Sequence, residues 1–170
     1  DCHIINTSGH SAYYSAHLNQ HPQSHFTVIR EFGAIGNGTS FALGVAAAFE
    51  GRPVILIDGD GSALMHIQEL ETMARHHLPI LTIILNDGAY GSEVHKLRSD
   101  GVTLAGSVFG RPNFAAIGDG FGVAGHQITS LDDISEKMNS FLSDQAPQIW
   151  DVVISDTIAS PQILAAHKAS

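Results

Sequence analysis

Two apolar runs near the middle of the chain each end in an acidic, glycine-bearing turn. Residues 53–57 lead into DGDGS at 58–62, and residues 80–85 lead into NDGAYG at 86–91. Between them Leu64, Ile67, Leu70 and Ala74 recur three or four positions apart, which predicts a helix. This pattern indicates a βαβ unit. Ligands of open parallel sheets bind outside the carboxyl ends of the strands, so both turns are expected to face one crevice.

The same reading extends to both sides of this unit. Further strands are predicted at 4–6, 26–29, 123–128 and 148–154, and helices at 12–18, 39–49, from about 91, at 113–122 and at 131–142. We expect Ser130 to open the last of these helices. A second GDG, at 118–120, follows helix-like sequence and is predicted to be a turn. The fold class is therefore α/β, a doubly wound, mostly parallel six-stranded sheet with helices on both faces.

Composition bounds the number of domains and the class of partner. A chain of 170 residues, 44% of them hydrophobic, suits one well-buried domain. The net charge of −9 argues against nucleic acid or an anionic membrane as partner. There is one cysteine, no apolar run of about 20 residues and no visible signal peptide, which predicts a cytoplasmic protein. Because residue 1 is not Met and a strand follows almost at once, we expect a piece of a longer chain.

The chemistry of the two turns is complementary. Gly59 and Gly61 allow backbone N–H groups to approach an anion at a helix N-terminus. Asp60 would repel a bare phosphate, so its presence implies a bridging cation. Asp87 offers a second oxygen ligand and the Ala89 carbonyl a third, a set that suits Mg²⁺ better than zinc. The eleven histidines are expected to lie on the surface.

The paired motif, GDGS followed by NDGAYG with Asp87 27 positions after Asp60, resembles the diphosphate-binding signature of thiamine-diphosphate enzymes. Among these the chain is similar to the group of acetolactate synthase, benzoylformate decarboxylase and pyruvate decarboxylase, from about Ser8 to about Ile154. The resemblance implies that residues 1–170 form one C-terminal diphosphate-binding domain, with thiamine diphosphate and Mg²⁺ as cofactors. It also implies a lyase or transferase acting on 2-keto acids. The family more often has Asn where this chain has Asp87, which adds negative charge at the metal.

The resemblance assigns roles to further positions. Gly9, His10 and Ser11 would contact the diphosphate, although Ser8 or Ser11 could equally serve as an ordinary helix N-cap. The Gly33 carbonyl would accept a hydrogen bond from the aminopyrimidine amino group, and Ile35 would hold the cofactor in a V shape. The alternative for Ile35 is a plain core residue. The remaining cofactor contacts would come from the two turns, namely Gly59, Asp60, Gly61, Ser62, Asp87, Ala89, Tyr90 and Gly91.

Glu93 is the candidate catalytic residue. In the pyruvate decarboxylase branch a carboxylate at the same offset from the metal ligand assists proton transfer, whereas the acetolactate synthase branch has apolar residues there. The alternative is an acidic residue that favours a helix N-terminus, an effect of ~0.3–1 kcal/mol. His95 lies two positions further along and is expected to point elsewhere, onto the surface or an interface.

The resemblance also implies a missing part. In the family, a pyrimidine-binding domain of the same or another chain supplies a glutamate that activates the cofactor, so this chain is not expected to be active alone. A homodimer or homotetramer with a 2-keto acid substrate follows. Three alternatives remain: the β-type subunit of a split sulfopyruvate or phosphonopyruvate decarboxylase, a non-catalytic Mg²⁺–diphosphate binding module, and an unrelated nucleotide-binding protein. The absence of the P-loop motif, and of a G-x-G-x-x-G that follows a predicted strand, counts against the last.

Overall fold

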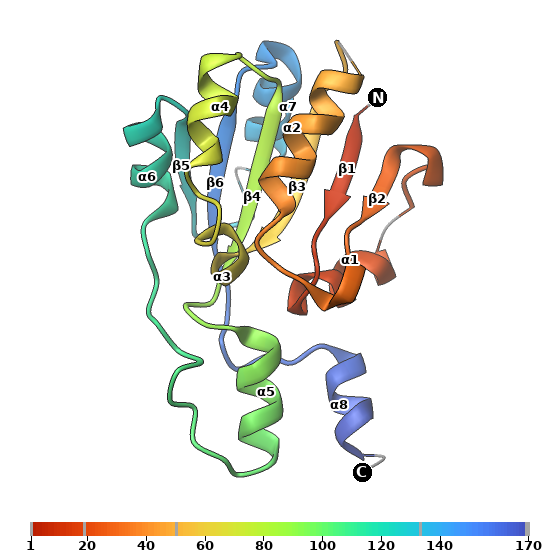
Figure 1. Cartoon of the computed structure of the whole chain (residues 1–170), viewed down its shortest axis with the longest axis vertical. Helices are drawn as coiled ribbons and strands as arrows, with labels where there is room; N and C mark the ends of the chain where they lie inside the picture. The colour runs from red at the N-terminus through yellow and green to blue at the C-terminus, as the bar shows by residue number, and fades with distance from the viewer. Residues whose placement is uncertain (1, 19, 50, 133, 169–170) are drawn as a thin grey trace.

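A computed structural model of the chain describes residues 2–18, 20–49, 51–132 and 134–168. In this part of the chain six parallel strands form one sheet in the order β2-β1-β3-β4-β6-β5 (Figure 1). They are β1 (His3–Asn6), β2 (Phe26–Val28), β3 (Val54–Gly59), β4 (Ile80–Asn86), β5 (Ala124–Ile128) and β6 (Gln148–Val153). The prediction of a doubly wound, six-stranded α/β sheet is confirmed, and the sheet is parallel throughout.

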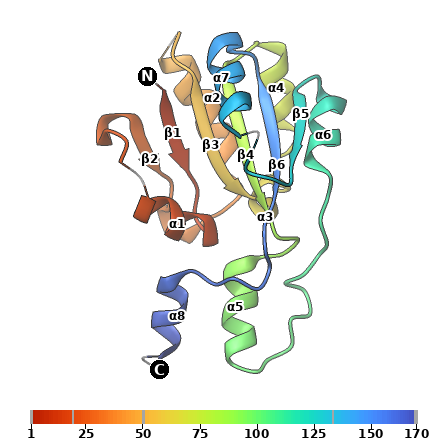
Figure 2. The same ribbon diagram turned by 180° about the vertical axis from the view of Figure 1, so that it is seen from behind.

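The helices lie between successive strands along the chain, except the last helix, which follows β6. They are α1 (His10–Leu18), η1 (Gln23–His25), η2 (Glu31–Gly33), α2 (Gly38–Ala48), α3 (Asp60–Ala63), α4 (Glu69–Arg75), α5 (Gly91–Ser99), α6 (Phe114–Phe121), α7 (Ile134–Asp144) and α8 (Pro161–Lys168), where η marks a 3₁₀ helix. α5 and α8 lie beyond the carboxyl edge of the sheet, where the strand arrows end (Figures 1 and 2). These two helices pack on each other.

Apolar side chains cover both faces of the sheet, as the near-continuous apolar runs require. On one face Ala42 of α2, Met73 of α4 and Phe114 of α6 pack against strand residues such as Leu56 and Ile84. On the other face Phe141 of α7 packs with a set from the strands: Ile55, Leu81, Ile128 and Trp150. Both faces of the sheet are therefore covered, and a ligand can reach the strands only at the edge of the sheet.

The strand order reverses direction between β1 and β3. The chain runs outward from β1 to β2, then returns to the other side of β1 and continues to β4. Connections therefore diverge at the carboxyl ends of β1 and β3, which leaves a crevice between them. The turns after β1, β3 and β4 meet at this crevice, as the sequence predicts.

Three local predictions are wrong. The single helix expected across 64–74 is divided into α3 and α4, because His66 turns into the interior while Leu64 and Met65 are left 38% and 51% exposed. The second GDG is the last part of α6 rather than a turn, and Gly122 ends that helix with φ 81°. The helix expected from 131 begins at Ile134, since Asp132 N–H bonds the Ser130 hydroxyl in a local turn first; Asp133 lies outside the described residues.

Candidate functional site

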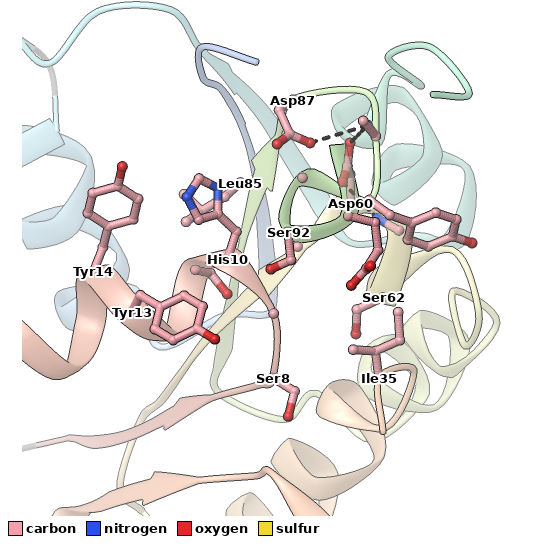
Figure 3. Close-up of a pocket in the computed structure, with 18 of the residues that line it drawn as sticks. Ser8, His10, Tyr13, Tyr14, Ile35, Asp60, Ser62, Leu85, Asp87 and Ser92 are labelled. Carbon is pink, nitrogen blue, oxygen red and sulfur yellow. Dashed lines mark hydrogen bonds between the residues drawn. The ribbon is translucent and has the colours of Figure 1, made fainter. Parts of the chain in front are cut away.

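A pocket of ≈ 380 Å³ lies at the carboxyl edge of the sheet, where the turns after β1, β3 and β4 converge. All fourteen site residues predicted from the sequence line it: Gly9, His10, Ser11, Gly33, Ile35, Gly59, Asp60, Gly61, Ser62, Asp87, Ala89, Tyr90, Gly91 and Glu93. Figure 3 shows Asp60 and Asp87 on one side, Tyr13 and Tyr14 on the other, and His10 between them. The structure thus brings together residues separated by up to 84 positions, while their individual roles stay predictions.

Asp60 ties the turn after β3 to the turn after β4. Its Oδ2 accepts hydrogen bonds from the N–H groups of Gly88 at 2.6 Å and Ala89 at 3.3 Å, and its Oδ1 accepts from Gly61 N–H at 2.8 Å. The side chain is only 2% exposed. Burial, and then the charge of Asp87, raise the pKa of Asp60 to about 7. A carboxylate held this way is electrostatically unsatisfied and suited to a cation.

Asp87 faces the same space from the end of β4. It is 8% exposed, and its Oδ1 accepts from Ala89 N–H at 3.2 Å. Burial raises its pKa, while the backbone donor and Arg111 counteract that rise. Each carboxylate oxygen can accept more than one interaction, so neither backbone contact prevents metal ligation. Both buried carboxylates thus accept from the same Ala89 N–H. Two carboxylates placed in this way indicate a site that binds a cation.

The buried carboxylate of Asp58 lies beneath the turn after β3 and holds this turn in place. Asp58 is fully buried, and its Oδ1 accepts from the Thr7 hydroxyl and from Gly59 N–H at 2.9 Å. Burial raises the pKa of Asp58 to about 6, against the opposing effect of these hydrogen bonds. His66 Nε2 lies 3.5 Å from Asp58 Oδ2. These contacts fit a role for Asp58 in holding the loop after β3.

Two glycines of the motifs leave room for specific neighbours. A Cβ on Gly61 would lie 2.6 Å from Cε1 of Tyr90, and one on Gly91 would lie 2.3 Å from Oδ2 of Asp87. A Cβ on Gly59, by contrast, would have no neighbour within 4 Å. Gly61 thus lets Tyr90 of the second turn approach the first turn, and Gly91 leaves room for the Asp87 carboxylate within the second turn.

The turn after β1 contributes His10 and Ser11. Ser11 is 7% exposed, and its hydroxyl has no hydrogen-bond partner among the described residues. The His10 ring packs edge-on against His95 with 4.8 Å between ring centroids. The expectation of a surface or interface position for His95 is wrong, because α5 turns this side chain inward and leaves it 6% exposed. His3 and His66 are buried too, so the histidines are not uniformly on the surface.

Gly33 and Ile35 form the rim on the β2 side. Gly33 adopts φ 66°, a left-handed conformation that glycine tolerates best. Gly36 N–H donates to the Ser62 hydroxyl at 2.9 Å, which joins this rim to α3. Ile35 is half-buried and faces the pocket rather than the core. Its position fits a side chain that supports a ligand better than a plain core residue.

Glu93 lies in the first turn of α5 at the mouth of the pocket. Its Oε1 accepts from Lys96 Nζ at 2.8 Å, in an i,i+3 pair whose side chains are about half exposed. Such exposed pairs stabilise little, ~0–1 kcal/mol, so the pairing leaves Glu93 available for other contacts. The geometry is compatible with both roles considered for this residue.

Several pocket residues were not predicted from the sequence. Arg30 lies over the ring of Tyr13 with 5.5 Å between its guanidinium carbon and the ring centroid. Ser8, Tyr14, Leu85, Ser92, Lys96 and Ile154 also line the pocket. Tyr13 and Tyr14, three and four positions after His10 on α1, and Lys96, three positions after Glu93 on α5, share a helical spacing with a predicted residue. Arg30 has no such signal, because the end of β2 reaches the pocket only through sheet order.

The donor set fits a diphosphate with a hard cation. Among the described residues no group of three His, Cys, Asp or Glu side chains is placed to hold a metal. An ion between Asp60 and Asp87 would therefore need further oxygen ligands from the backbone, water or a ligand's phosphates. The pairing of residues 88–90 with 107–109 uses the Gly88 carbonyl and the Tyr90 N–H. It does not use the Ala89 carbonyl, which therefore stays a candidate ligand.

Comparison with known proteins gives one consistent family. Residues 7–152 match the family described as thiamine pyrophosphate enzyme, C-terminal TPP binding domain. The chain is 30% identical over 146 residues to the acetolactate synthase large subunit of Parasynechococcus marenigrum, which covers 84% of this chain and 24% of that protein. It is 29% identical over 130 residues to oxalyl-CoA decarboxylase of Escherichia coli K12, covering 72% and 22%.

A solved structure agrees with these relatives. The thiamine diphosphate-dependent 4-hydroxybenzoylformate decarboxylase of Rhodococcus jostii RHA1 superposes with a TM-score of 0.75 at 27% identity, covering 91% of this chain and 29% of that one. The chain thus spans about a quarter of the length of the relatives it matches. None of the helices in the described residues has the length and apolar character to cross a membrane.

Proposed function

Since the chain belongs to the family of thiamine pyrophosphate enzymes, as their C-terminal TPP binding domain, we propose that Asp60 and Asp87 hold a Mg²⁺ ion that anchors the cofactor's diphosphate. The observation that carries this proposal is the pair of buried carboxylates at the carboxyl edge of the sheet. Burial, and then repulsion from Asp87, raise the pKa of Asp60. Such a pair is stabilised by a divalent cation, and the net charge of −9 leaves few side-chain cations for the diphosphate itself.

The other pocket residues divide by the part of the cofactor they would contact. His10, Ser11 and the turns of Gly59–Ser62 and Ala89–Gly91 would surround the diphosphate and its metal. The Gly33 carbonyl and the Ile35 side chain would contact the aminopyrimidine end. The unpartnered hydroxyl of Ser11 supports this arrangement, because a buried hydroxyl without a partner is costly unless a ligand supplies one.

The whole protein, on this proposal, is a lyase or transferase acting on 2-keto acids, similar to acetolactate synthases and decarboxylases. When bound, thiamine diphosphate supplies the electron sink for breaking or making the bond beside a carbonyl carbon. The residues of this chain anchor the cofactor, orient it and close one side of its site. A pyrimidine-binding domain from the same or another chain would complete the site in a homodimer or homotetramer.

Calorimetric titration of thiamine diphosphate into the chain, first with Mg²⁺ and then with EDTA, tests the proposal. We expect binding that depends on Mg²⁺, and tighter binding by a full-length protein that includes the pyrimidine-binding domain. Absence of binding by both proteins would overturn the cofactor role. Turnover of a 2-keto acid by the full-length protein would exclude the non-catalytic module, and a pyrimidine-binding domain on the same chain would exclude the split-decarboxylase subunit.

Asp87→Asn separates repulsion from metal ligation. An amide oxygen is still a hard ligand, so Mg²⁺-dependent binding should weaken by less than about tenfold. Without the Asp87 charge, the pKa of Asp60 should fall. At pH 8 and without metal, the free energy of unfolding of the variant should therefore exceed that of the wild-type chain by on the order of 1 kcal/mol. This is the energy that corresponds to about one pKa unit. Urea denaturation at pH 8 and pH 5 measures this difference.

The sign of the pH dependence follows from the raised pKa. A carboxyl with a folded-state pKa near 7 destabilises the metal-free fold above that pH. The penalty disappears as the pH falls toward the unfolded value of 3.8, so the advantage of Asp87→Asn should shrink at pH 5. Protons also compete with Mg²⁺, so cofactor affinity should decline below about pH 7. An advantage that grows on acidification would contradict the assignment.

Glu93→Gln distinguishes catalysis from helix stabilisation. If Glu93 assists proton transfer, the variant of the full-length enzyme should lose about 10²–10⁴-fold in kcat, the usual contribution of a general acid or base. Thiamine diphosphate affinity should change by less than about threefold, since the side chain is half exposed and pairs only with Lys96. Steady-state kinetics and calorimetry measure the two effects separately. An unchanged kcat would leave Glu93 as a helix-start residue.

A further inference from the structure

His10 is fixed by a contact from the far end of the chain. The backbone N–H of Ser160, immediately before α8, donates to Nε2 of His10 at 2.9 Å across 150 residues of sequence. The ring also packs against Tyr14 at 5.2 Å and His95 at 4.8 Å between centroids. Ser160 is fully buried. The imidazole is thus held on three sides before any ligand arrives.

The direction of that hydrogen bond determines the tautomer. A nitrogen that accepts an N–H bond carries no proton, so a neutral ring must carry its proton on Nδ1. Burial, and then the neighbouring His95, lower the pKa of His10 to about 4, which keeps the ring neutral at physiological pH. His10 is therefore expected to be the Nδ1–H tautomer.

Nδ1 points toward the diphosphate side of the pocket. A Cβ built on Gly91, the first residue of α5, would lie 3.4 Å from His10 Nδ1. His10 lines the pocket between the tyrosines of α1 and the two aspartates (Figure 3). Within the described residues no hydrogen bond from Nδ1 is found. The ring thus presents a donor, and no acceptor, at the place where the proposed diphosphate would lie.

The segment that carries Ser160 is itself held along the pocket. Ile154 N–H bonds the Asn86 carbonyl at 3.1 Å, and Arg98 donates to the Asp156 carbonyl at 3.0 Å. Arg111 donates to the Ile154 carbonyl at 3.0 Å. The residues between β6 and α8 therefore lie against α5 and the turn after β4. Because Ser160 lies in this segment and donates to His10, the contacts that hold the segment also hold the His10 ring.

We propose that Ser160 is a positioning residue whose backbone N–H holds His10 as the Nδ1–H tautomer. The ring then donates a hydrogen bond from Nδ1 to a diphosphate oxygen. In this way the segment before α8 contributes to cofactor affinity. The acceptor in this inference rests on the proposed function; the tautomer does not. Ser160 acts through His10 and touches no ligand.

Nitrogen-15 NMR of the chain, labelled at histidine and free of ligand, reads the tautomer directly. The His10 signals, assigned by their loss in His10→Asn, should show a protonated Nδ1 and an unprotonated Nε2 at neutral pH. The reverse pattern would overturn the proposal whether or not the chain binds thiamine diphosphate. A wild-type chain that shows the expected tautomer but binds no cofactor would instead count against the proposed function.

Two isosteres of histidine test the donor. The amide nitrogen of His10→Asn occupies the place of Nδ1, whereas that of His10→Gln occupies the place of Nε2. Affinity for thiamine diphosphate with Mg²⁺ should fall by less than about threefold in His10→Asn. It should fall by at least about tenfold in His10→Gln, the expected loss of one hydrogen bond to a charged group. Equal losses in the two variants would rule out donation from Nδ1.

Ser160→Pro removes the N–H, and Ser160→Ala is its matched control. The alanine keeps the N–H and loses only the hydroxyl, which accepts weakly from Ile163 N–H at 3.4 Å. We expect wild-type NMR signals and affinity in Ser160→Ala. In Ser160→Pro, if it folds, the His10 proton should redistribute toward Nε2 and affinity should fall about tenfold. An unaltered tautomer in a folded Ser160→Pro chain would contradict the role of Ser160, and the histidine isosteres decide the donor independently.

Discussion

Replacing Asp60 with alanine is expected to weaken Mg²⁺-dependent binding of thiamine diphosphate by more than about 100-fold. Residues that only support a metal ligand account for roughly 10–100-fold in affinity, and Asp60 is proposed as a ligand itself. The variant also loses the acceptor of three backbone N–H groups, from Gly61, Gly88 and Ala89. Both losses act on the same two turns, which makes this the largest binding effect expected in the chain.

Calorimetry with and without EDTA measures the effect. Asp60→Ala in Mg²⁺ should resemble the wild-type chain in EDTA, and EDTA should change the variant little. Asp119→Ala is the matched control, because Asp119 lies in the same tripeptide, GDG, on α6 outside the pocket. Circular dichroism establishes that each variant is folded. An Asp60→Ala chain that keeps its Mg²⁺-dependent affinity would remove Asp60 from the metal site.

The contrast between the two GDG tripeptides shows what the sequence can and cannot predict. The first follows an apolar run that becomes β3, and its partner motif begins 27 residues later, so its place at the sheet edge was predictable. The second has the same letters, but Gly118 is buried against Ile149 of β6 within a helix. That contact depends on how α6 lies on the sheet. Local spacing alone does not specify it.

The buried histidines illustrate the same limit. Spacing on α5 predicts that His95 and Glu93 point in different directions, which the structure agrees with, but it does not say which direction is buried. His95 is covered because His10, held by Ser160, lies beside it. His66 breaks the expected helix because Asp58 lies beneath it. In each case the deciding partner comes from a segment that the local pattern does not include.

The strands and the motif turns were predictable for a common physical reason. A parallel sheet buried on both faces needs short apolar runs, and these stand out in a chain with 17 glycines and 15% charged residues. Ligand turns must follow such runs directly, so their position relative to the sheet is set by the sequence itself. Arg30 reaches the pocket only because β2 lies beside β1 at its edge. Strand order therefore had to be known before this residue could be placed.

Replacing Gly125 with alanine is expected to have the largest effect on stability. Gly125 lies in β5, where a Cβ would be 2.0 Å from the Ala115 carbonyl oxygen and 2.6 Å from its carbonyl carbon. These are backbone atoms of α6, so they cannot rotate away as a side chain could. Overpacking usually costs ~1–3 kcal/mol and occasionally more, and a contact with rigid backbone belongs at the upper end. We therefore expect a loss of about 3 kcal/mol or more in the free energy of unfolding.

Two other glycines in the same region make the test specific. A Cβ on Gly118 would lie 2.2 Å from Cγ2 of Ile149, a side-chain atom that can shift, so Gly118→Ala should destabilise less than Gly125→Ala. Gly120 has open space around it within α6, and Gly120→Ala should stabilise by ~0.5–1 kcal/mol through helix propensity. Urea denaturation of the three variants should give this order. If Gly125→Ala unfolded within about 1 kcal/mol of the wild-type chain, α6 could not lie as close to β5 as the structure has it, because no rotation of a side chain relieves a clash between a Cβ and a helix backbone.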